Sequence, residues 1–288
     1  MFHRDGLGCC CIDGRGGRSL YQKTLTAKMK LQGNITPRPS IAAVTGLALA
    51  WLVTPVPAVA QNAYITNQGV YPNFSNKVTV IDTTTNKVVT TIDVGLAPAG
   101  VAVTPDGSKV YVANEAVNGT VSVIDTATNT VSATVAVGRH PVGVAVKPDG
   151  SKIYVANRGD GTVSVIDATN KVVATIKVGL APFGVAVTPD GSTVYVTNLN
   201  NTVSVIATAT NAVSATISVG NGPLGVAFTP DGSKAYVANQ YDHTVSVIAT
   251  ASNTVVATID VGTSPIAFGI FILPRFAGTA GSPTTRRK

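Results

Sequence analysis

The sequence predicts an all-β protein: a five-bladed β-propeller of four-stranded antiparallel blades, closed by a C-terminal strand that completes the N-terminal blade. Three observations lead to this fold class. The tripeptide Pro-Asp-Gly recurs at intervals of 43, 41 and 41 residues, starting at Pro105, Pro148, Pro189 and Pro230. The repeated segments are rich in Val, Ile, Thr and Tyr. Incomplete repeats stand at both ends of the repetitive region.

Each complete repeat contains four short apolar segments separated by turn residues. In the first complete repeat these segments are residues 100–103, 109–114, 120–125 and 131–137. β-Branched and aromatic residues favour strands, and the Pro-Asp-Gly and Asp-Thr-Ala-Thr-Asn segments between them are typical of turns. No stretch shows the 3.6-residue apolar period of a helix. Four strands at a period of about 40 residues are typical of a propeller blade.

The two ends of the repetitive region set the number of blades. Three strand segments, AYITN, KVTVID and VVTTIDV, precede the first complete repeat. One further segment, residues 266–273, follows the last repeat. Together they make a fifth blade, and the added strand would remove an open sheet edge.

The first 60 residues do not continue this pattern. Residues 41–53 are an uncharged apolar run, preceded by Lys30 and Arg38 and followed by Ala-Val-Ala at 58–60. This order is typical of a secretory signal peptide, cleaved here after Ala60. A transmembrane anchor is the alternative, although prolines interrupt the end of the run. The predicted organisation is therefore an extension and signal peptide at 1–60, the propeller at 61–274 and a flexible tail at 275–288.

This organisation predicts a secreted, periplasmic or cell-surface protein without a membrane span in its mature chain. The formal net charge is +7, yet residues 61–274 carry 10 Lys and Arg against 12 Asp and Glu. A nucleic-acid-binding protein concentrates basic residues on its folded face, so we expect no nucleic-acid partner. The three cysteines are adjacent, at 9–11, and lack the spacing of metal ligands. We expect neither a metal nor another cofactor.

The repeated segments VYVAN and TVSVIDTATNTV and the terminal PIAFGIFIL are similar to the YVTN family of β-propeller repeats, found in secreted and cell-surface proteins of bacteria and archaea. The resemblance extends from Ala63 to about Leu273. It implies the propeller fold and export, but little chemistry. Relatives often have seven blades, so five blades would be a departure from the family.

Residues that recur in every repeat are expected to build the scaffold. Asp106 and its counterparts belong to turns, Tyr111 and its counterparts to the packing, and Asn114 and its counterparts bind loop amides at strand ends. Polar residues that do not recur are the candidates for a ligand- or partner-binding face. These candidates are Glu115, Arg139, His140, Arg158, Asp160, Tyr241, Asp242 and His243.

The innermost strand of each predicted blade contains no Asp, Glu, His or Cys. A metal-dependent hydrolase needs such oxygen ligands near the axis. The leading hypothesis is therefore an exported, non-enzymatic scaffold that binds a protein or glycan at the cell envelope, with no catalytic residue. One alternative is a lactonase-like or lyase-like propeller hydrolase with a site built from loops. Another is a structural protein of the envelope.

Overall fold

The computed structural model describes residues 61–70, 72–267 and 272. The predicted extension, signal peptide and tail lie outside these residues. The described part contains nineteen strands and no helix, and so no helix there could cross a membrane. The all-β prediction is confirmed.

The strands form one three-stranded sheet and four four-stranded sheets, each antiparallel with sequential strands as neighbours. In chain order the strands are β1 (Asn62–Val70), β2 (Asn73–Asp82), β3 (Lys87–Asp93), β4 (Pro98–Val103), β5 (Lys109–Asn114), β6 (Thr120–Asp125), β7 (Thr130–Ala136), β8 (Pro141–Val146), β9 (Lys152–Asn157), β10 (Thr162–Asp167), β11 (Val172–Lys177), β12 (Pro182–Val187), β13 (Thr193–Asn198), β14 (Thr202–Ala207), β15 (Ala212–Ser218), β16 (Pro223–Phe228), β17 (Lys234–Asn239), β18 (Thr244–Ala249) and β19 (Thr254–Asp260).

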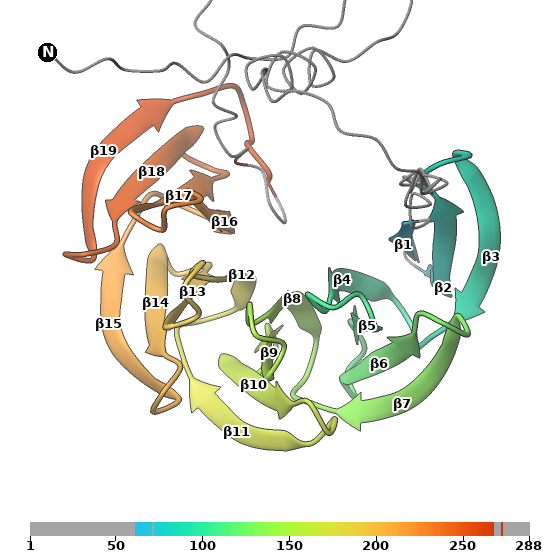
Figure 1. Ribbon diagram of the computed structural model, residues 1–288. Coiled ribbons are helices and arrows are strands. Elements are labelled where there is room, and N and C mark those ends of the chain that lie inside the picture. The colour runs from blue at the N-terminus through green and yellow to red at the C-terminus, as the bar shows by residue number, and fades with distance from the viewer. Residues whose placement is uncertain (1–60, 71, 268–271, 273–288) are drawn as a thin grey trace, which may run out of the picture. The chain divides into compact units, whose positions relative to one another are not determined.

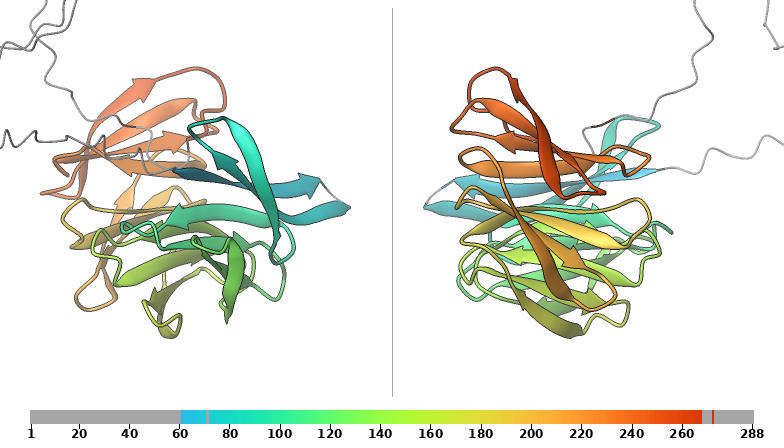
Figure 2. Two further views of the ribbon diagram at one scale, coloured as in Figure 1. Left: turned by 45° about the vertical axis from the view of Figure 1, so that its right-hand side comes forward. Right: turned by 90° about the vertical axis from the view of Figure 1, so that its left-hand side faces the viewer.

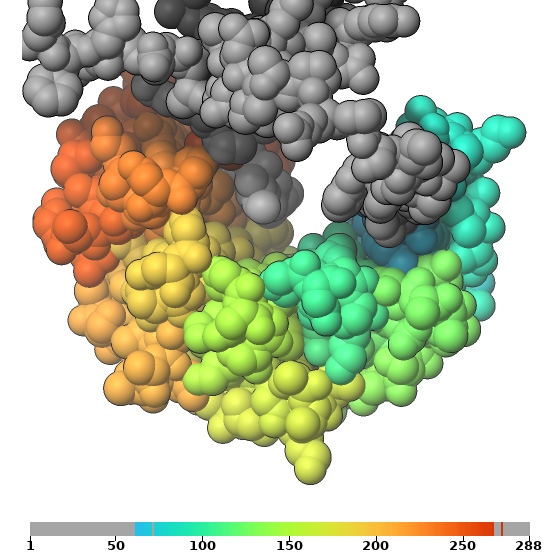
Figure 3. Space-filling view, in the orientation of Figure 1, coloured from blue at the N-terminus to red at the C-terminus, as the bar shows by residue number. Residues whose placement is uncertain are grey.

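The five sheets follow one another along an arc in chain order, with β4, β8, β12 and β16 toward the middle (Figure 1). Side views show that the strands within each sheet are twisted (Figure 2). In the space-filling view, neighbouring sheets from β4 to β19 lie against one another (Figure 3). The apolar core lies between neighbouring sheets. Tyr111 and Val123 of the second sheet, for example, share a buried cluster with Ile153 and Ile166 of the third.

Closure of the ring by residues 266–273 is not seen in the described part of the chain. Ile266 and Ala267 form no strand there, and the first sheet contains only β1, β2 and β3. Residues 268–271 and 273 lie outside the description. The described residues therefore support five sheets in sequence, without the predicted closing strand.

Glycines allow the innermost strands to approach one another closely. Each of these strands has a glycine whose added Cβ would overlap a backbone carbonyl oxygen of the following segment. No side chain fits in this space, which explains the glycine at that position of every repeat. The four pairs are Gly100 with Val142, Gly143 with Phe183, Gly184 with Leu224, and Gly225 with Ala267.

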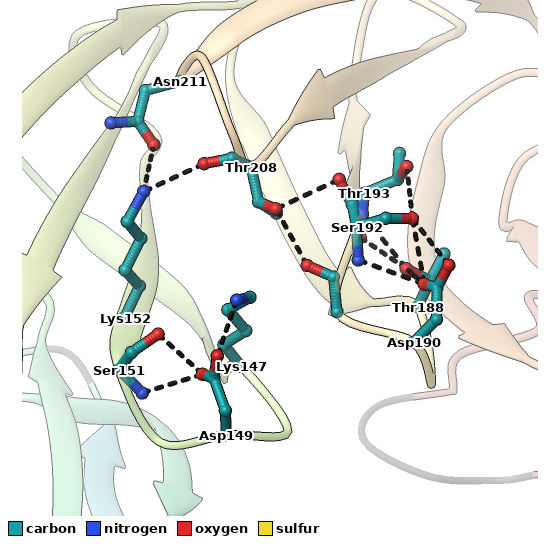
Figure 4. Close-up of polar contacts among 11 residues, drawn as sticks. Lys147, Asp149, Ser151, Lys152, Thr188, Asp190, Ser192, Thr193, Thr208 and Asn211 are labelled. Atoms are coloured by element: carbon teal, nitrogen blue, oxygen red, sulfur yellow. Dashed lines mark hydrogen bonds and ion pairs between the residues drawn. The ribbon is translucent and has the colours of Figure 1, made fainter.

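The aspartates of the Pro-Asp-Gly turns hold the turn backbone, as predicted. Asp149 Oδ1 accepts hydrogen bonds from the backbone N–H and hydroxyl of Ser151, and Asp190 Oδ1 accepts the same two from Ser192 (Figure 4). In the last sheet, a hydrogen bond from the Thr229 hydroxyl, followed by those from Ser233, lowers the pKa of Asp231 to about 2. The carboxylates stay charged at neutral pH and stabilise the turns through these hydrogen bonds.

The recurring asparagines at the strand ends have partners different from those predicted. Asn114 Nδ2 donates to the hydroxyls of Thr120 and Ser122 on the adjacent strand, at 2.9 and 3.0 Å. The same pair of contacts recurs at Asn157, Asn198 and Asn239. Loop amides are therefore not the acceptors or donors that fix these side chains. The asparagines join β-strands within each blade.

A second recurring contact joins one blade to the next. The hydroxyl of Tyr64 donates to Asn129 Oδ1, and that of Tyr111 donates to Asn170 Oδ1, at 2.7 and 2.9 Å. The hydroxyl of Tyr195 donates to Asn253 in the same way. The asparagines lie in turns of the following sheet with φ between +53° and +64°, a conformation that Asn tolerates better than most residues. We call this contact the tyrosine latch.

The latch is missing at Tyr154, whose buried hydroxyl has no hydrogen-bond partner. The expected acceptor, Asn211 Oδ1, instead accepts a bond from Lys152 Nζ at 3.1 Å, while Lys152 also donates to the Thr208 carbonyl (Figure 4). Burial raises the pKa of Tyr154 to about 12, so its hydroxyl keeps its proton at any ordinary pH. One of the blade interfaces therefore lacks a bond that its neighbours have.

This difference gives a matched pair of variants. We expect Tyr111→Phe to lower the free energy of unfolding by about 1 kcal/mol, because it removes a satisfied hydrogen bond and leaves Asn170 with one partner fewer. Tyr154→Phe removes no hydrogen bond and should change that free energy by less than about 0.5 kcal/mol. Urea denaturation of the two variants would measure this difference. Equal losses would show that the latch adds no stability.

Candidate functional site

A cavity of about 450 Å³ lies at the middle of the described sheets. Its wall is formed by the innermost strands β4, β8, β12 and β16, with single contributions from β1 and from the loop between β5 and β6. We call it the axial cavity. Its lining residues are Gln68, Ala99, Gly100, Val101, Glu115, Val142, Gly143, Val144, Phe183, Gly184, Val185, Gly225 and Val226.

Glu115 is the ionisable residue of this lining, and it is the only glutamate in the sequence. Its carboxylate accepts hydrogen bonds from Gln68 Nε2 at 2.7 Å and from Arg158 Nη1 at 3.2 Å. The Glu115 side chain is only 17% exposed, whereas that of Arg158 is 46% exposed. The carboxylate is thus fixed at the edge of the cavity between a neutral donor and a cation.

The Arg158 guanidinium also lies over the ring of Phe183, with its Cζ 5.9 Å from the ring centroid. These contacts connect four successive sheets, since Gln68 comes from the first, Glu115 from the second, Arg158 from the third and Phe183 from the fourth. We call these four residues the mouth cluster. A carboxylate, a guanidinium, an amide and an aromatic ring thus meet beside the apolar cavity.

Three of the four residues occupy one position of the repeat. Gln68, Glu115 and Arg158 each follow the recurring asparagine of a repeat, Asn67, Asn114 and Asn157. Asn114 and Asn157 end β5 and β9, whereas β1 continues to Val70. The backbone N–H of Glu115 donates to the Ala97 carbonyl, and that of Arg158 donates to the His140 carbonyl. The scaffold therefore holds this position in the same place in successive blades, while its side chain varies.

Arg139 and Asp160, both predicted as site residues, form a separate pair that stabilises a turn. Asp160 accepts bonds from the Arg139 backbone N–H at 2.7 Å and from Arg139 Nε at 2.6 Å. The hydrogen bond from the Arg139 side chain, together with that from its backbone, lowers the pKa of the Asp160 carboxyl below its ordinary value. The pair joins the loop between β7 and β8 to the loop between β9 and β10, and neither residue lines the axial cavity.

The remaining candidates are loop residues in the described structure. His140 has a φ of +50° just before a proline, and Asp242 Oδ2 accepts the backbone N–H of Asn221 at 2.7 Å. His243 Nδ1 accepts the backbone N–H of Ser264 at 2.9 Å. The ring of Tyr241, a residue 63% exposed, lies against Gly222. Of the eight predicted residues, only Glu115 and Arg158 belong to the mouth cluster.

The donor set does not fit a catalytic metal ion. Among the described residues there is no group of three or more His, Cys, Asp or Glu side chains that could hold one. Within the described lining of the axial cavity, Glu115 is the one residue of these four types. Among the described residues, the carboxylate and the guanidinium are the charged groups of the mouth cluster.

Gln68 and Phe183 were not predicted from the sequence. Gln68 could have been found by aligning the position after each recurring asparagine, where the residues are Gln68, Glu115, Arg158, Leu199 and Gln240. Phe183 follows the proline that begins β12, where the other complete repeats have Ala99, Val142 and Leu224. Both stand at positions where the side chain varies from one repeat to the next.

Comparison with protein families shows a match over residues 69–259, about two thirds of the chain, to the family described as "Lactonase, 7-bladed beta-propeller". The family is described as seven-bladed, whereas the described residues form five sheets. No curated protein matches the chain.

Among the solved structures that resemble the chain are the following two. Hydrazine synthase of Kuenenia stuttgartiensis is 32% identical with a TM-score of 0.54, over 56% of this chain and 48% of its own. This chain thus spans about half the length of that one. A functionally unknown protein from Desulfotomaculum acetoxidans DSM 771 is 25% identical with a TM-score of 0.58, over 69% of each chain. Together with the sheets described above, these matches show a β-propeller protein.

Proposed function

Because this chain belongs to the family of seven-bladed β-propeller lactonases, we propose that it is a hydrolase that opens lactone rings at the mouth of its axial cavity. The observation that carries the proposal is the position of the Glu115 carboxylate, fixed between Gln68 and Arg158 at the edge of a cavity of about 450 Å³. Cavities of this size suit small-molecule ligands.

The prediction of a non-enzymatic binding scaffold is wrong, because the match to a lactonase family overturns it. Its main premise was the absence of acidic side chains from the innermost strands. That premise holds for β4, β8, β12 and β16, but a loop residue supplies the carboxylate. Strand sequences alone therefore do not limit the chemistry of an axial site.

In the proposed reaction, Glu115 acts as the general base. Its carboxylate accepts a proton from a water molecule while the water oxygen attacks the lactone carbonyl carbon. The Arg158 guanidinium lies beside the carboxylate and stabilises the negative charge that develops on the carbonyl oxygen. The ring C–O bond then breaks, the proton passes to the leaving alkoxide oxygen, and the product is a hydroxy acid.

The proposal extends to the finer features that the sequence suggests. The YVTN-type repeat and the apolar run at 41–53 support export, with cleavage after Ala60. The carbonyl of Ala267 faces Gly225 as its counterparts face the glycines of earlier blades, which supports a fifth innermost strand in the segment that follows β19. The lactone is then hydrolysed outside the cytoplasm by a five-bladed propeller.

A panel of lactones tests this proposal with the purified full chain. We expect ring opening, measured by release of acid in a pH-stat, and we expect Glu115→Gln to lower kcat by at least about 100-fold. Glutamine keeps the size of the side chain and its Oε1 can still accept one of the two hydrogen bonds, but it cannot take the proton.

Asp160→Asn is the matched control, because Asp160 also forms a carboxylate–arginine pair but lies outside the cavity lining. Its turnover should equal that of the unmodified chain. The proposed site is refuted if Glu115→Gln retains full turnover. The proposed function is refuted if no lactone is opened.

A further inference from the structure

The residues that line the axial cavity indicate which class of lactone the site can bind. Of its thirteen lining residues, eleven are Gly, Ala, Val or Phe, and the other two, Gln68 and Glu115, belong to the mouth cluster. Apart from these two side chains, the described lining therefore presents alkyl groups and the ring of Phe183. Apolar walls of this kind favour ligands whose apolar surface is exposed to water in the free state and buried in the bound state.

Both oxygens of the carboxylate in the mouth cluster already have partners. Glu115 accepts bonds from both Gln68 and Arg158, and Arg158 lies over Phe183. The backbone in the wall of the fourth sheet is also satisfied, since Thr197 Oγ1 accepts the Gly184 N–H and donates to the Leu224 carbonyl, each at 2.8 Å. Apart from Gln68 and Glu115, the side chains of the described lining offer no hydrogen-bonding group to the hydroxyls of a sugar ring.

The charge of the mouth disfavours an anionic substrate. Glu115 is the ionisable residue of the lining, and the nearby cation Arg158 is paired with it. A phosphate or carboxylate group on the substrate would meet a carboxylate and a guanidinium that already neutralise each other, and the rest of the described lining has no cation. Burying an anion without an excess of positive charge is costly.

We infer that the substrate is an uncharged lactone carrying an apolar substituent, such as an alkyl chain, with the chain in the axial cavity and the ring at the mouth cluster. This inference rests on the proposed function and adds the class of substrate. The ring carbonyl then lies beside Arg158 and Glu115, while the substituent lies against the valines of β4, β8 and β12. The division of the site into a polar mouth and an apolar wall matches the two parts of such a molecule.

The test compares kcat/KM of the full chain for γ-butyrolactone, γ-hexalactone, γ-octalactone and γ-decalactone with that for a phosphorylated sugar δ-lactone. We expect kcat/KM to rise by up to about fourfold for each methylene that enters the cavity, the effect of burying one CH₂ group. The phosphorylated lactone should be the poorest substrate.

A change in the wall should alter this chain-length dependence. Val185→Phe places a larger side chain in the lining, so it should lower kcat/KM for γ-decalactone by at least about tenfold more than it lowers that for γ-butyrolactone. Val256→Phe is the control, because Val256 lies on β19 and is exposed. Val144→Phe, on the neighbouring strand, is the second variant if Val185→Phe does not fold.

The outcomes separate the two proposals. If kcat/KM does not change with chain length, or if the phosphorylated lactone is preferred, the inferred substrate class is wrong and the proposed function stands. If no lactone is opened, calorimetric titration of the full chain with γ-decalactone decides whether the cavity binds such molecules. Absence of both turnover and binding overturns both proposals.

Discussion

Gly143→Ala should lower the free energy of unfolding by about 3 kcal/mol. A Cβ at this position would overlap the carbonyl oxygen of Phe183 on the neighbouring innermost strand. The atom in the way belongs to backbone, so the strain cannot be relieved by a change of rotamer, and overpacking of this kind costs up to about 3 kcal/mol. For a domain of this size, the melting temperature should fall by roughly 6–12 °C.

Gly262→Ala is the control for this variant. Nothing lies within 4 Å of a Cβ added at Gly262, and its φ is outside the left-handed region. The free energy of unfolding should therefore stay within about 0.5 kcal/mol of that of the unmodified chain. A Gly143→Ala chain as stable as Gly262→Ala would show that the innermost strands are farther apart in solution than in the structure.

Ile217→Ala should cost about 3 kcal/mol, whereas Ile259→Ala should cost less than about 1 kcal/mol. The two isoleucines hold equivalent places on β15 and β19, where they pair with Val203 and Val245. Ile217 is 5% exposed because the following sheet covers it, but Ile259 is 45% exposed. Removing buried methyl groups leaves a cavity, and removing exposed ones does not.

Guanidinium denaturation of the two variants measures this difference directly. A large loss at Ile217 with a small one at Ile259 would show that the outer face of the last described sheet is uncovered in solution. Equal losses would contradict that expectation, because they would mean that another segment or a second molecule packs on β19.

The repeat made most of the fold predictable. The period and the strand-forming residues predicted β5 and β6 to the residue and β7 to within one residue. The innermost strand begins at Pro98 and not at Gly100, because Pro98 pairs with Asn114 across an irregular register before Val101. Closure could not be settled in this way, since it depends on how five twisted sheets accumulate curvature and not on the local pattern of any one repeat.

The candidate site was predictable only in part. Glu115 and Arg158 differ from their counterparts in other repeats, and this difference marked them. Their contact with each other and with Gln68 depends on the angle between neighbouring blades, which a pattern within one repeat does not contain. The same limit explains why Arg139 and Asp160 were grouped with them, since both pairs differ from the repeat consensus but only one lies at the cavity.

The tyrosine latch has a consequence for how such chains change in evolution. It joins a residue of one repeat to a residue of the next in the same manner at three interfaces. Duplication or loss of one repeat unit in the gene therefore creates no new kind of junction, since the flanking units already carry both halves of the contact. The number of repeats can change while the contacts between neighbouring repeats stay of the same kind. A chain with five described sheets can thus share ancestry with a family that is described as seven-bladed.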